Sequence, residues 1–263
     1  MDSSTRLTLA REAARAGAEV AHGGFRGPLT VETKKNALDS VTEFDREVQR
    51  HVVGMFREDD SDAVIVGEEE LPDVETRTSL PESGTAWVVD PIDGTNNFVA
   101  GNRVWGCAVA AVEDGDAVAA VNEFPALGDS FAAAADGAMR NGEPCTVSTR
   151  ADPETFTINP IFGLQPRDRR KLAEYISTIA EEFGDSRRFG SSQYALSSVA
   201  AGELDAAVSG VELSPWDTVG GVHMVRAAGG TVTNLDGDRW TPGDAGIIAS
   251  NGKAHDELVA AFD

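Results

Sequence analysis

The chain has 263 residues and a formal net charge of -22, from 44 acidic and 22 basic side chains. That length is enough to bury a large hydrophobic core, in one big domain or in two closely packed halves. The charge argues against nucleic acid as a partner, because a phosphate backbone is bound by a basic surface.

The sequence shows no pattern typical of a membrane-spanning segment or a secretory signal. It has no long apolar span, and the residues after Met1 lead directly into a charged amphipathic segment. We therefore expect a cytoplasmic protein with no membrane partner.

Acidic residues are spread along the whole chain, and lysine occurs only at Lys34, Lys35, Lys171 and Lys253. This pattern is typical of halophilic adaptation to a high-salt cytoplasm, where salt screens the repulsion between carboxylates. The alternative, a buffer for polyvalent cations, predicts clustered acidic loops, which the sequence lacks. The two cysteines and four histidines show neither a disulfide framework nor the ligand spacing of a metal site.

The first half of the chain combines helices with an antiparallel meander. Apolar residues at helical spacing predict helices over residues 5–21 and 42–56, with a polar, irregular link over 27–38 between them. Apolar runs separated by turn residues predict strands at 63–66, 87–89, 104–112, 117–121 and 130–134.

Strands and helices alternate in the second half, which is typical of an α/β layer. Strands are expected at 156–158, 187–189, 205–208, 231–233 and 246–249. Helices are expected over 166–183, 192–202 and 253–262, with a further helix that begins near Asp217. We divide the chain into an α+β half, residues 1–150, and an α/β half, residues 151–263, in one compact unit.

The stretch from Trp87 to Phe98 organises the rest of the chain. A short apolar strand runs into Asp90-Pro91-Ile92-Asp93-Gly94-Thr95, and Pro91 has no N–H, so the chain must turn there. If a helix begins near Gly94, Asp93 is its N-cap, and the free amides of Gly94 and Thr95 face the same space as both carboxylates. Hard cations and a phosphate group could share that space. A turn with a helix cap would explain the same residues without any function.

Three more acidic residues have both a structural and a functional interpretation. Glu68 directly follows an apolar strand, a position common to solvated loops and to metal or phosphate sites. Asp217 lies at the start of a helix, where it could be a cap or a ligand. Asp45 follows Thr42 by three residues, as in a capping box.

Taken in order, these motifs resemble those of the inositol monophosphatase family, which are magnesium-dependent, lithium-sensitive phosphomonoesterases. The residues that carry the resemblance are Gly67-Glu68-Glu69, Asp90 to Phe98, and Trp216-Asp217 with Gly220-Gly221. The likeness covers nearly the whole chain. It implies a layered αβαβα sandwich of the sugar phosphatase type, a homodimer, and a catalytic unit whose two halves both supply metal motifs.

The resemblance also implies two Mg²⁺ ions, with a third and weaker ion near Glu68 as an open alternative. Glu68, Asp90 and the backbone carbonyl of Ile92 correspond to the ligands of the first ion. Asp90, Asp93 and Asp217 correspond to the ligands of the second. Carboxylate and carbonyl oxygens suit this hard cation, and it would supply the positive charge that phosphate ester hydrolysis needs.

Catalytic roles follow from the same resemblance. A metal-activated water would be oriented by Glu68 and Thr95, and Asp45 would hydrogen-bond Thr95. Asp93 and the amides of Gly94 and Thr95 would contact the phosphate.

Lysine stands at the family's conserved basic position, as Lys34 or its neighbour Lys35, where it would neutralise nearby acids. Substrate contacts are less well marked. The inositol-selective animal enzymes have a glutamate seven residues before the last metal aspartate, where this chain has Gly210. Glu212 could substitute for that glutamate or face solvent.

The expected substrate is an inositol monophosphate or a related sugar phosphate. A fructose-1,6-bisphosphatase, as in the bifunctional archaeal-type relatives, is the main alternative. A 3'(2'),5'-bisphosphate nucleotidase fits less well, because no adenine-binding signature is recognisable. A non-catalytic metal- or phosphate-binding regulator on the same fold would be expected to have lost an acidic ligand, and none is missing.

Overall fold

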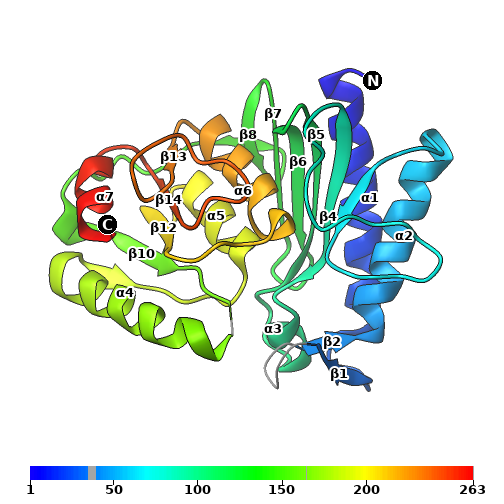
Figure 1. Ribbon diagram of the computed structural model, residues 1–263, viewed down its shortest axis with the longest axis horizontal. Coiled ribbons are helices and arrows are strands. Elements are labelled where there is room, and N and C mark those ends of the chain that lie inside the picture. The colour runs from blue at the N-terminus through cyan, green and yellow to red at the C-terminus, as the bar shows by residue number, and fades with distance from the viewer. Residues whose placement is uncertain (35–39, 164, 263) are drawn as a thin grey trace.

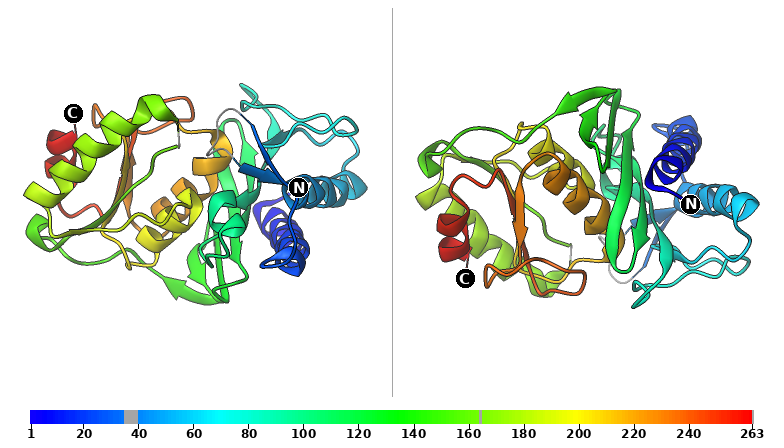
Figure 2. Two further views of the ribbon diagram at one scale, coloured as in Figure 1. Left: turned by 90° about the horizontal axis from the view of Figure 1, so that it is seen from below. Right: turned by 90° about the horizontal axis from the view of Figure 1, so that it is seen from above.

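The chain folds into five layers, in the order helix, sheet, helix, sheet, helix (Figures 1 and 2). The computed structural model describes residues 1–34, 40–163 and 165–262. Within this part of the chain, hydrophobic clusters fill the space on both sides of the larger sheet and beneath the outer helices of the smaller one. The fold is the αβαβα sandwich expected from the sequence.

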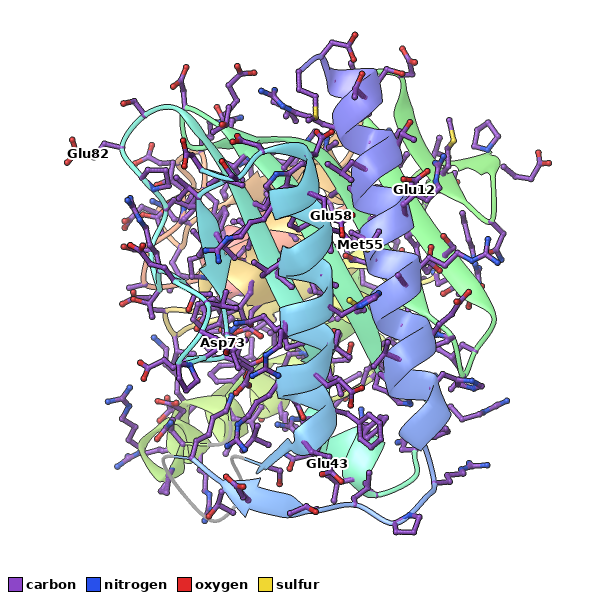
Figure 3. The ribbon with its side chains drawn as sticks, turned by 90° about the vertical axis from the view of Figure 1, so that its right-hand side faces the viewer. Glu12, Glu43, Met55, Glu58, Asp73 and Glu82 are labelled. Atoms are coloured by element: carbon purple, nitrogen blue, oxygen red, sulfur yellow. The ribbon has the colours of Figure 1, made fainter. Side chains whose placement is uncertain are left out.

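Helices α1 (Ser3–Gly24) and α2 (Glu43–Asp59) cover the outer face of the larger sheet (Figure 3). The buried side of α1 is mostly alanine and glycine, which lets the helix lie close to its neighbours. A Cβ atom on Gly17 would come within 2.9 Å of both Cys107 Sγ and Val52 Cγ2. Both predicted helices are confirmed, and each extends somewhat beyond its expected range.

The larger sheet has the strand order β3-β4-β5-β6-β7-β8-β9. Neighbouring strands are antiparallel except β3 and β4, which run parallel. The predicted meander is confirmed, and it is rich in alanine and valine because helices cover both of its faces. The strands are β3 (Ile65–Gly67), β4 (Thr85–Asp93), β5 (Gly106–Glu113), β6 (Asp116–Phe124), β7 (Asp129–Ala134), β8 (Gly137–Arg140) and β9 (Glu143–Cys145).

Helices α5 (Ser192–Ala200) and α6 (Pro215–Ala227) form the middle layer between the two sheets. They pack tightly, since a Cβ atom on Gly221 would lie 2.5 Å from Leu196 Cβ. The small residues after Asp217 therefore serve the close packing that their size suggests.

The smaller sheet has the strand order β11-β10-β12-β14-β13 and is mixed, with β10 parallel to β11 and β12. Its strands are β10 (Thr157–Pro160), β11 (Asp185–Ser186), β12 (Ala206–Ser209), β13 (Thr231–Thr233) and β14 (Ile247–Ser250). Helices α4 (Arg169–Glu182) and α7 (His255–Phe262) cover its outer face (Figure 1). Short 3-10 turns lie at Pro153–Thr155 and Pro166–Asp168.

The structure corrects two predictions about strands. The link between the first two helices contains an antiparallel pair, β1 (Val31–Thr33) and β2 (Ser40–Thr42), although residues 35–39 of that link lie outside the described part. The short strand expected near 187–189 forms two residues earlier, as β11 (Asp185–Ser186), and the backbone pairing does not reach Phe189, whose N donates to the side chain of Asn159 at 3.0 Å.

No helix in the described ranges is long and apolar enough to span a membrane. The larger sheet lies within residues 65–145 and the smaller one within residues 157–250. The division of the chain at residue 150 stays a prediction. The end of β4, the end of β10 and the beginnings of α5 and α6 all border one cavity.

Candidate active site

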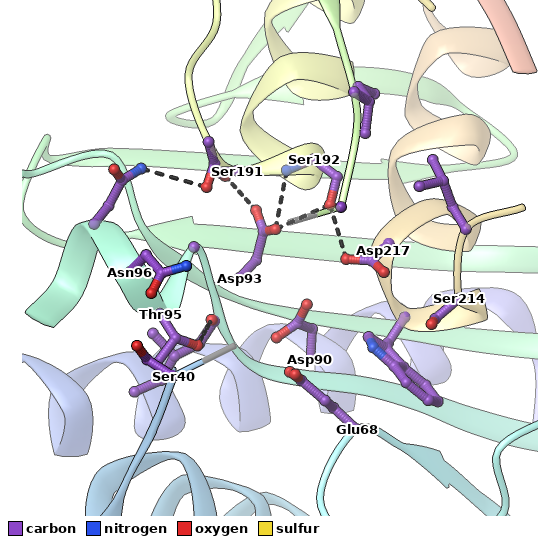
Figure 4. A pocket seen from close by; sticks show the side chains of 18 of the residues that line it. Ser40, Glu68, Asp90, Asp93, Thr95, Asn96, Ser191, Ser192, Ser214 and Asp217 are labelled. Atoms are coloured by element: carbon purple, nitrogen blue, oxygen red, sulfur yellow. Dashed lines mark hydrogen bonds between the residues drawn. The ribbon is translucent and has the colours of Figure 1, made fainter. Parts of the chain in front are cut away.

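A cavity of about 690 Å³ opens between the two sheets (Figure 4). Its walls come from the end of β4 and the following helix α3 (Thr95–Val99), from the segment after β10, and from the first turns of α5 and α6. Both halves of the sequence therefore contribute to one chamber.

The carboxylates of Asp90, Asp93 and Asp217 meet in this cavity, with one oxygen of each within 4.8 Å of the others. In a regular strand, residues three positions apart point to opposite faces. The register of β4 against β5 shifts between Asp90 and Asp93, at Pro91, and this irregularity lets both side chains face the cavity. The three-residue spacing therefore brings both carboxylates into the cavity only because β4 is irregular between Asp90 and Asp93.

Asp93 caps a different helix from the expected one. Gly94, with a φ of 91°, is the N-cap of α3, and no side chain caps that helix. Asp93 instead accepts hydrogen bonds from the start of α5, at 3.0 Å from both Ser192 N and Gln193 N, and also from Ser191 Oγ. The prediction that Asp93 is the N-cap at Gly94 is therefore wrong, because tertiary contact brings another helix terminus to the carboxylate.

Ser191 and Ser192 were missed in the sequence analysis. Ser191 is the N-cap of α5 and accepts from Tyr194 N at 3.1 Å. The hydroxyl of Ser192 lies 3.0 Å from an oxygen of Asp93 and 3.0 Å from an oxygen of Asp217. Its single proton can be donated to only one of them at a time. Serine after Gly190 at a helix start was a capping signal, but nothing local indicated which carboxylates it would meet.

The carboxylates of Asp90 and Asp93, which are buried, and of Asp217, which is partly buried, repel one another. Burial, with the nearby charges of Glu68 and Asp93, raises the pKa of Asp217 to about 7. Burial and the same crowding raise the pKa of Asp90 well above its usual range. Burial also raises the pKa of Asp93, although its hydrogen bonds to α5 oppose the shift.

Asp90 Oδ1 is buried and has no hydrogen-bond partner among the described residues. A buried anionic oxygen without a partner is costly unless a cation binds it. Asp90, Asp93 and Asp217 thus form an oxygen-only donor set of the kind that suits a hard divalent cation. The residues present fit a metal site.

Glu68 lies directly after β3, at the edge of the same cavity (Figure 4). Lys34 Nζ donates to Glu68 Oε1 at 3.0 Å and also to the buried carboxylate of Glu69. Burial alone would lower the pKa of Lys34, but the charges of Glu68 and Glu69 outweigh it and raise that pKa. Lys35, the alternative basic residue, lies outside the described ranges.

Asp45 stands behind Thr95 and not in the cavity wall. Thr95 Oγ1 lies 3.0 Å from Asp45 Oδ1 and 3.0 Å from the carbonyl oxygen of Ile92. The capping box is present, since the Thr42 hydroxyl accepts from the backbone amide of Asp45 and the Asp45 carboxylate accepts from Thr42 N at 2.7 Å. The Thr42 hydroxyl also donates to Asp45 Oδ2 at 2.6 Å. Burial raises the pKa of Asp45 to about 6, although the Thr42 hydrogen bonds oppose the shift. Asp45 is therefore both a helix cap and a partner of Thr95.

Glu212 is exposed, and the residues that line the cavity include its neighbour Leu213 but not Glu212 itself. Gly210 faces away from the cavity, because a Cβ atom there would meet Lys171 Cε at 2.3 Å and Tyr175 Oη at 2.5 Å. The position of Glu212 gives no support to the predicted substrate contact. A different residue, Arg188, lines the wall opposite the sheet of β4.

The model of the inositol monophosphatase family matches residues 2–263. The chain belongs to the inositol monophosphatase family. Curated relatives in it include the fructose-1,6-bisphosphatase/inositol-1-monophosphatase of Thermotoga maritima, 33% identical over 87% of this chain and 84% of its own length. The histidinol-phosphatase of Mycobacterium tuberculosis is also 33% identical, over 89% of this chain and 88% of its own length.

Solved structures of the family have the same architecture. The inositol monophosphatase structure from Thermotoga maritima has a TM-score of 0.87 and 30% identity, covering 98% of this chain and 96% of its own. These relatives are named as phosphatases that act on different phosphate monoesters. Membership in the family therefore supports a phosphomonoesterase activity for this chain, and the substrate is a separate question.

Proposed function

We propose that this protein is a Mg²⁺-dependent phosphomonoesterase that hydrolyses inositol monophosphate or a related sugar phosphate. The observation that carries the proposal is the cluster of the buried Asp90 and Asp93 with the partly buried Asp217, in which one oxygen of each carboxylate lies within 4.8 Å of the others. No lysine or arginine side chain bonds to any of these three carboxylates in the described ranges. Their charge is left for a metal ion to balance.

Two ions are proposed, with the ligands that the family resemblance implies. Glu68, Asp90 and the carbonyl of Ile92 would hold one, and Asp90, Asp93 and Asp217 would hold the other. A third, weaker ion beside Glu68 stays an open alternative. When bound, Mg²⁺ supplies the charge that neutralises the phosphate oxygens and makes water a better nucleophile.

Thr95 and Asp45 are proposed to take up the proton of the attacking water. When Thr95 Oγ1 donates to Asp45 Oδ1, its lone pairs are free to accept a hydrogen bond from a water in the cavity. A pKa of about 6 places Asp45 where it can take up a proton near neutral pH. The water would lose its proton toward Thr95 and the threonine would pass its own to Asp45.

The phosphate is proposed to sit against Asp93, Gly94 and Thr95. Position 94 has no room for a side chain, since a Cβ there would lie 3.0 Å from the carbonyl oxygen of Val104 and 3.2 Å from that of Gly190. The left-handed backbone at Gly94 also favours glycine. Amides at the start of α3 are then available for the phosphate oxygens.

One observation favours the second candidate substrate, fructose 1,6-bisphosphate. Lys34, Arg46 and Arg188 line the cavity. Lys34 is paired with acids and Arg46 with Glu32, whereas the contact of Arg188 is the carbonyl of Phe162 at 3.5 Å. Arg188 has no acidic partner among the described residues, and such a guanidinium suits a second phosphate group.

The function is tested by measuring phosphate release from inositol 1-phosphate, fructose 1,6-bisphosphate and adenosine 3',5'-bisphosphate. Turnover is expected with Mg²⁺ and is expected to vanish in EDTA. Turnover of none of the three would contradict the proposed function. The Arg188→Gln variant separates the candidates, because a raised KM for the bisphosphate alone would assign Arg188 to its second phosphate.

A homodimer in the cytoplasm completes the proposal, on the strength of the family resemblance. Light scattering coupled to size-exclusion chromatography should give twice the mass of one chain. A mass equal to one chain would contradict the dimer.

A further inference from the structure

The side chain of Gln193 connects the two helices that carry the C-terminal part of the site. Gln193 is only 1% exposed and lies in the first turn of α5. Its backbone amide donates to Asp93 Oδ2 at 3.0 Å, and its Nε2 donates to the carbonyl oxygen of Trp216 at 2.5 Å. Trp216 directly precedes Asp217 in the first turn of α6. One residue thus bonds to Asp93 and to the backbone that carries Asp217.

The orientation of this side chain is determined by its partners. The carbonyl of Trp216 can only accept, so Nε2 of Gln193 must point toward it and Oε1 must point the other way. Asn122 Nδ2 donates to that Oε1 at 3.0 Å and to Ser197 Oγ at 3.0 Å. Asn122 is fully buried and belongs to β6, a central strand of the larger sheet. A chain of hydrogen bonds therefore runs from β6 through Gln193 to the start of α6.

Close packing holds this polar pair in place. A Cβ atom on Gly220 would lie 3.5 Å from Asn122 Oδ1 and 3.5 Å from Gln193 Oε1. A Cβ atom on Gly221 would lie 3.0 Å from Gln193 Oε1. An added Cβ at Gly220 would thus only touch the two amides, whereas one at Gly221 would also lie 2.5 Å from Leu196 Cβ, so α6 cannot carry a side chain at position 221 and keep its position.

Burying these two amides is costly for stability. Asn122 Oδ1 is buried without a hydrogen-bond partner among the described residues, and the surrounding core is apolar. An unpaired buried acceptor is destabilising, and apolar side chains of similar volume would avoid that cost. The pair is therefore better explained by the geometry that it imposes than by the stability that it adds.

We propose that Asn122 and Gln193 are positioning residues that set the separation of Asp93 and Asp217, and with it the affinity for the second metal ion. The inference rests on the proposed function, because that ion is the one assigned to Asp90, Asp93 and Asp217. Neither amide needs to touch the metal. Outer partners that orient metal ligands typically change metal affinity by about 10- to 100-fold when they are removed.

The test is isothermal calorimetry of Mg²⁺ binding to metal-free protein, with the Gln193→Met and Asn122→Val variants. Methionine keeps the volume of glutamine but removes the bonds to Trp216 and Asn122. Gln193→Met should weaken the second Mg²⁺ by about tenfold or more. Asn122→Val should weaken the second Mg²⁺ less. The double variant should bind that ion no more weakly than Gln193→Met alone, because both substitutions act through the bond between Gln193 and the Trp216 carbonyl.

Two further variants distinguish positioning from a general loss of packing. Gln193→Glu keeps the acceptor for Asn122 but sets a carboxylate oxygen against the Trp216 carbonyl, so Mg²⁺ should bind at least as weakly as in Gln193→Met. Ser197→Ala removes a second oxygen acceptor of Asn122, which also contacts Met224 Sδ at 3.6 Å, without touching Trp216 or Asp93. Its Mg²⁺ affinity should stay within about twofold of wild type, given the small cost of a lost neutral hydrogen bond.

Wild-type Mg²⁺ affinity in Gln193→Met would overturn the inference, and so would an equal loss in Ser197→Ala. If Gln193→Met does not fold, Asn122→Val decides the question by the same comparison with Ser197→Ala. Calorimetry measures Mg²⁺ affinity directly and does not depend on catalytic activity. A wild-type protein that binds two Mg²⁺ ions but releases no phosphate would contradict the proposed function and leave this test intact.

Discussion

Asp93 shows how one carboxylate can serve structure and chemistry together. It accepts hydrogen bonds from the first amides of α5 and lies beside Asp90 and Asp217 in the cavity. A helix N-terminus stabilises a negative charge, and this partly offsets the cost of burying it. The remaining cost, seen in the raised pKa values of all three aspartates, is what a bound cation would remove.

We predict that Asp217→Asn reduces turnover by at least about a hundredfold, because it removes a proposed metal ligand. The metal-free variant should melt no lower than the wild type at pH 7.5, since asparagine relieves repulsion and can still accept from Ser192 Oγ. Steady-state kinetics and thermal melts with and without Mg²⁺ check both parts. Asp236→Asn, in an exposed turn, is the matched control and should behave as wild type.

His255 provides a pH prediction away from the site. Its Nε2 contacts Thr233 Oγ1 at 2.9 Å and its Nδ1 contacts Ser250 Oγ at 2.7 Å. Burial lowers its pKa below 6.5 in the folded protein, with Asp256 acting in the opposite direction. The unfolded chain therefore binds the proton more readily, and the stability that neutral His255 contributes is present above pH 6.5 and lost as the pH falls through the folded pKa.

We expect the difference in melting temperature between the wild type and His255→Gln to shrink as the pH falls from about 8 to about 5, because histidine titrates at position 255 and glutamine does not. Comparing the two proteins cancels the contribution of the carboxylates. A difference that stays constant or grows on acidification would be inconsistent with a lowered His255 pKa.

At the scale of single elements, the glycines of α1 and α2 have opposite surroundings. Gly17 of α1 faces the sheet, where a Cβ would lie 2.9 Å from Cys107 Sγ. Gly54 of α2 faces open space, with no atom within 4 Å of an added Cβ. Figure 3 shows the outer side of these helices, with Glu12 and Glu58 exposed along them and Met55 partly buried.

We predict that Gly54→Ala stabilises the protein by about 0.5–1 kcal/mol, because alanine is the better helix former and meets no obstacle. Gly17→Ala should instead destabilise it by about 1–3 kcal/mol through overpacking. Chemical denaturation of both variants measures the two effects. Changes of the same sign would show that helix propensity, and not packing, decides at both positions.

The breaks in elements matter as much as the elements themselves. The register of β4 shifts between Asp90 and Asp93, around Pro91, and Asn159 ends the ladder after β11 by accepting a hydrogen bond from Phe189 N. The first irregularity turns Asp90 and Asp93 toward one space, and beyond the second Ser191 and Ser192 donate hydrogen bonds to Asp93. The ends of α5 and α6 then face the end of β4 across the cavity (Figure 4).

At the scale of the whole molecule, the charge of -22 is spread over the surface and is not gathered at the site. Figure 3 shows Glu12, Glu58, Asp73 and Glu82 on one face, all of them exposed. Mutual repulsion of this kind destabilises a compact state and is weakened by salt.

We predict that the melting temperature rises with KCl concentration between about 0.1 and 2 M, because the Debye length falls from about 10 Å to below 3 Å over that range. Differential scanning calorimetry at constant pH measures the trend. A melting temperature that is flat or falls with KCl would exclude the proposed adaptation to high salt.

The sequence by itself determined the helices, the meander, the layered class and the family, because periodicity, turn residues and ordered motifs are local properties of the chain. It also brought out Glu68, Asp90, Asp93, Thr95 and Asp217 as candidates. Tertiary structure alone decided that Asp93 meets α5, that Ser192 lies between two carboxylates, and that Asn122 and Gln193 join β6 to α6. These contacts join residues about 25 to 100 positions apart. No local pattern encodes which helix end will meet which strand end, since packing of the layers sets that choice.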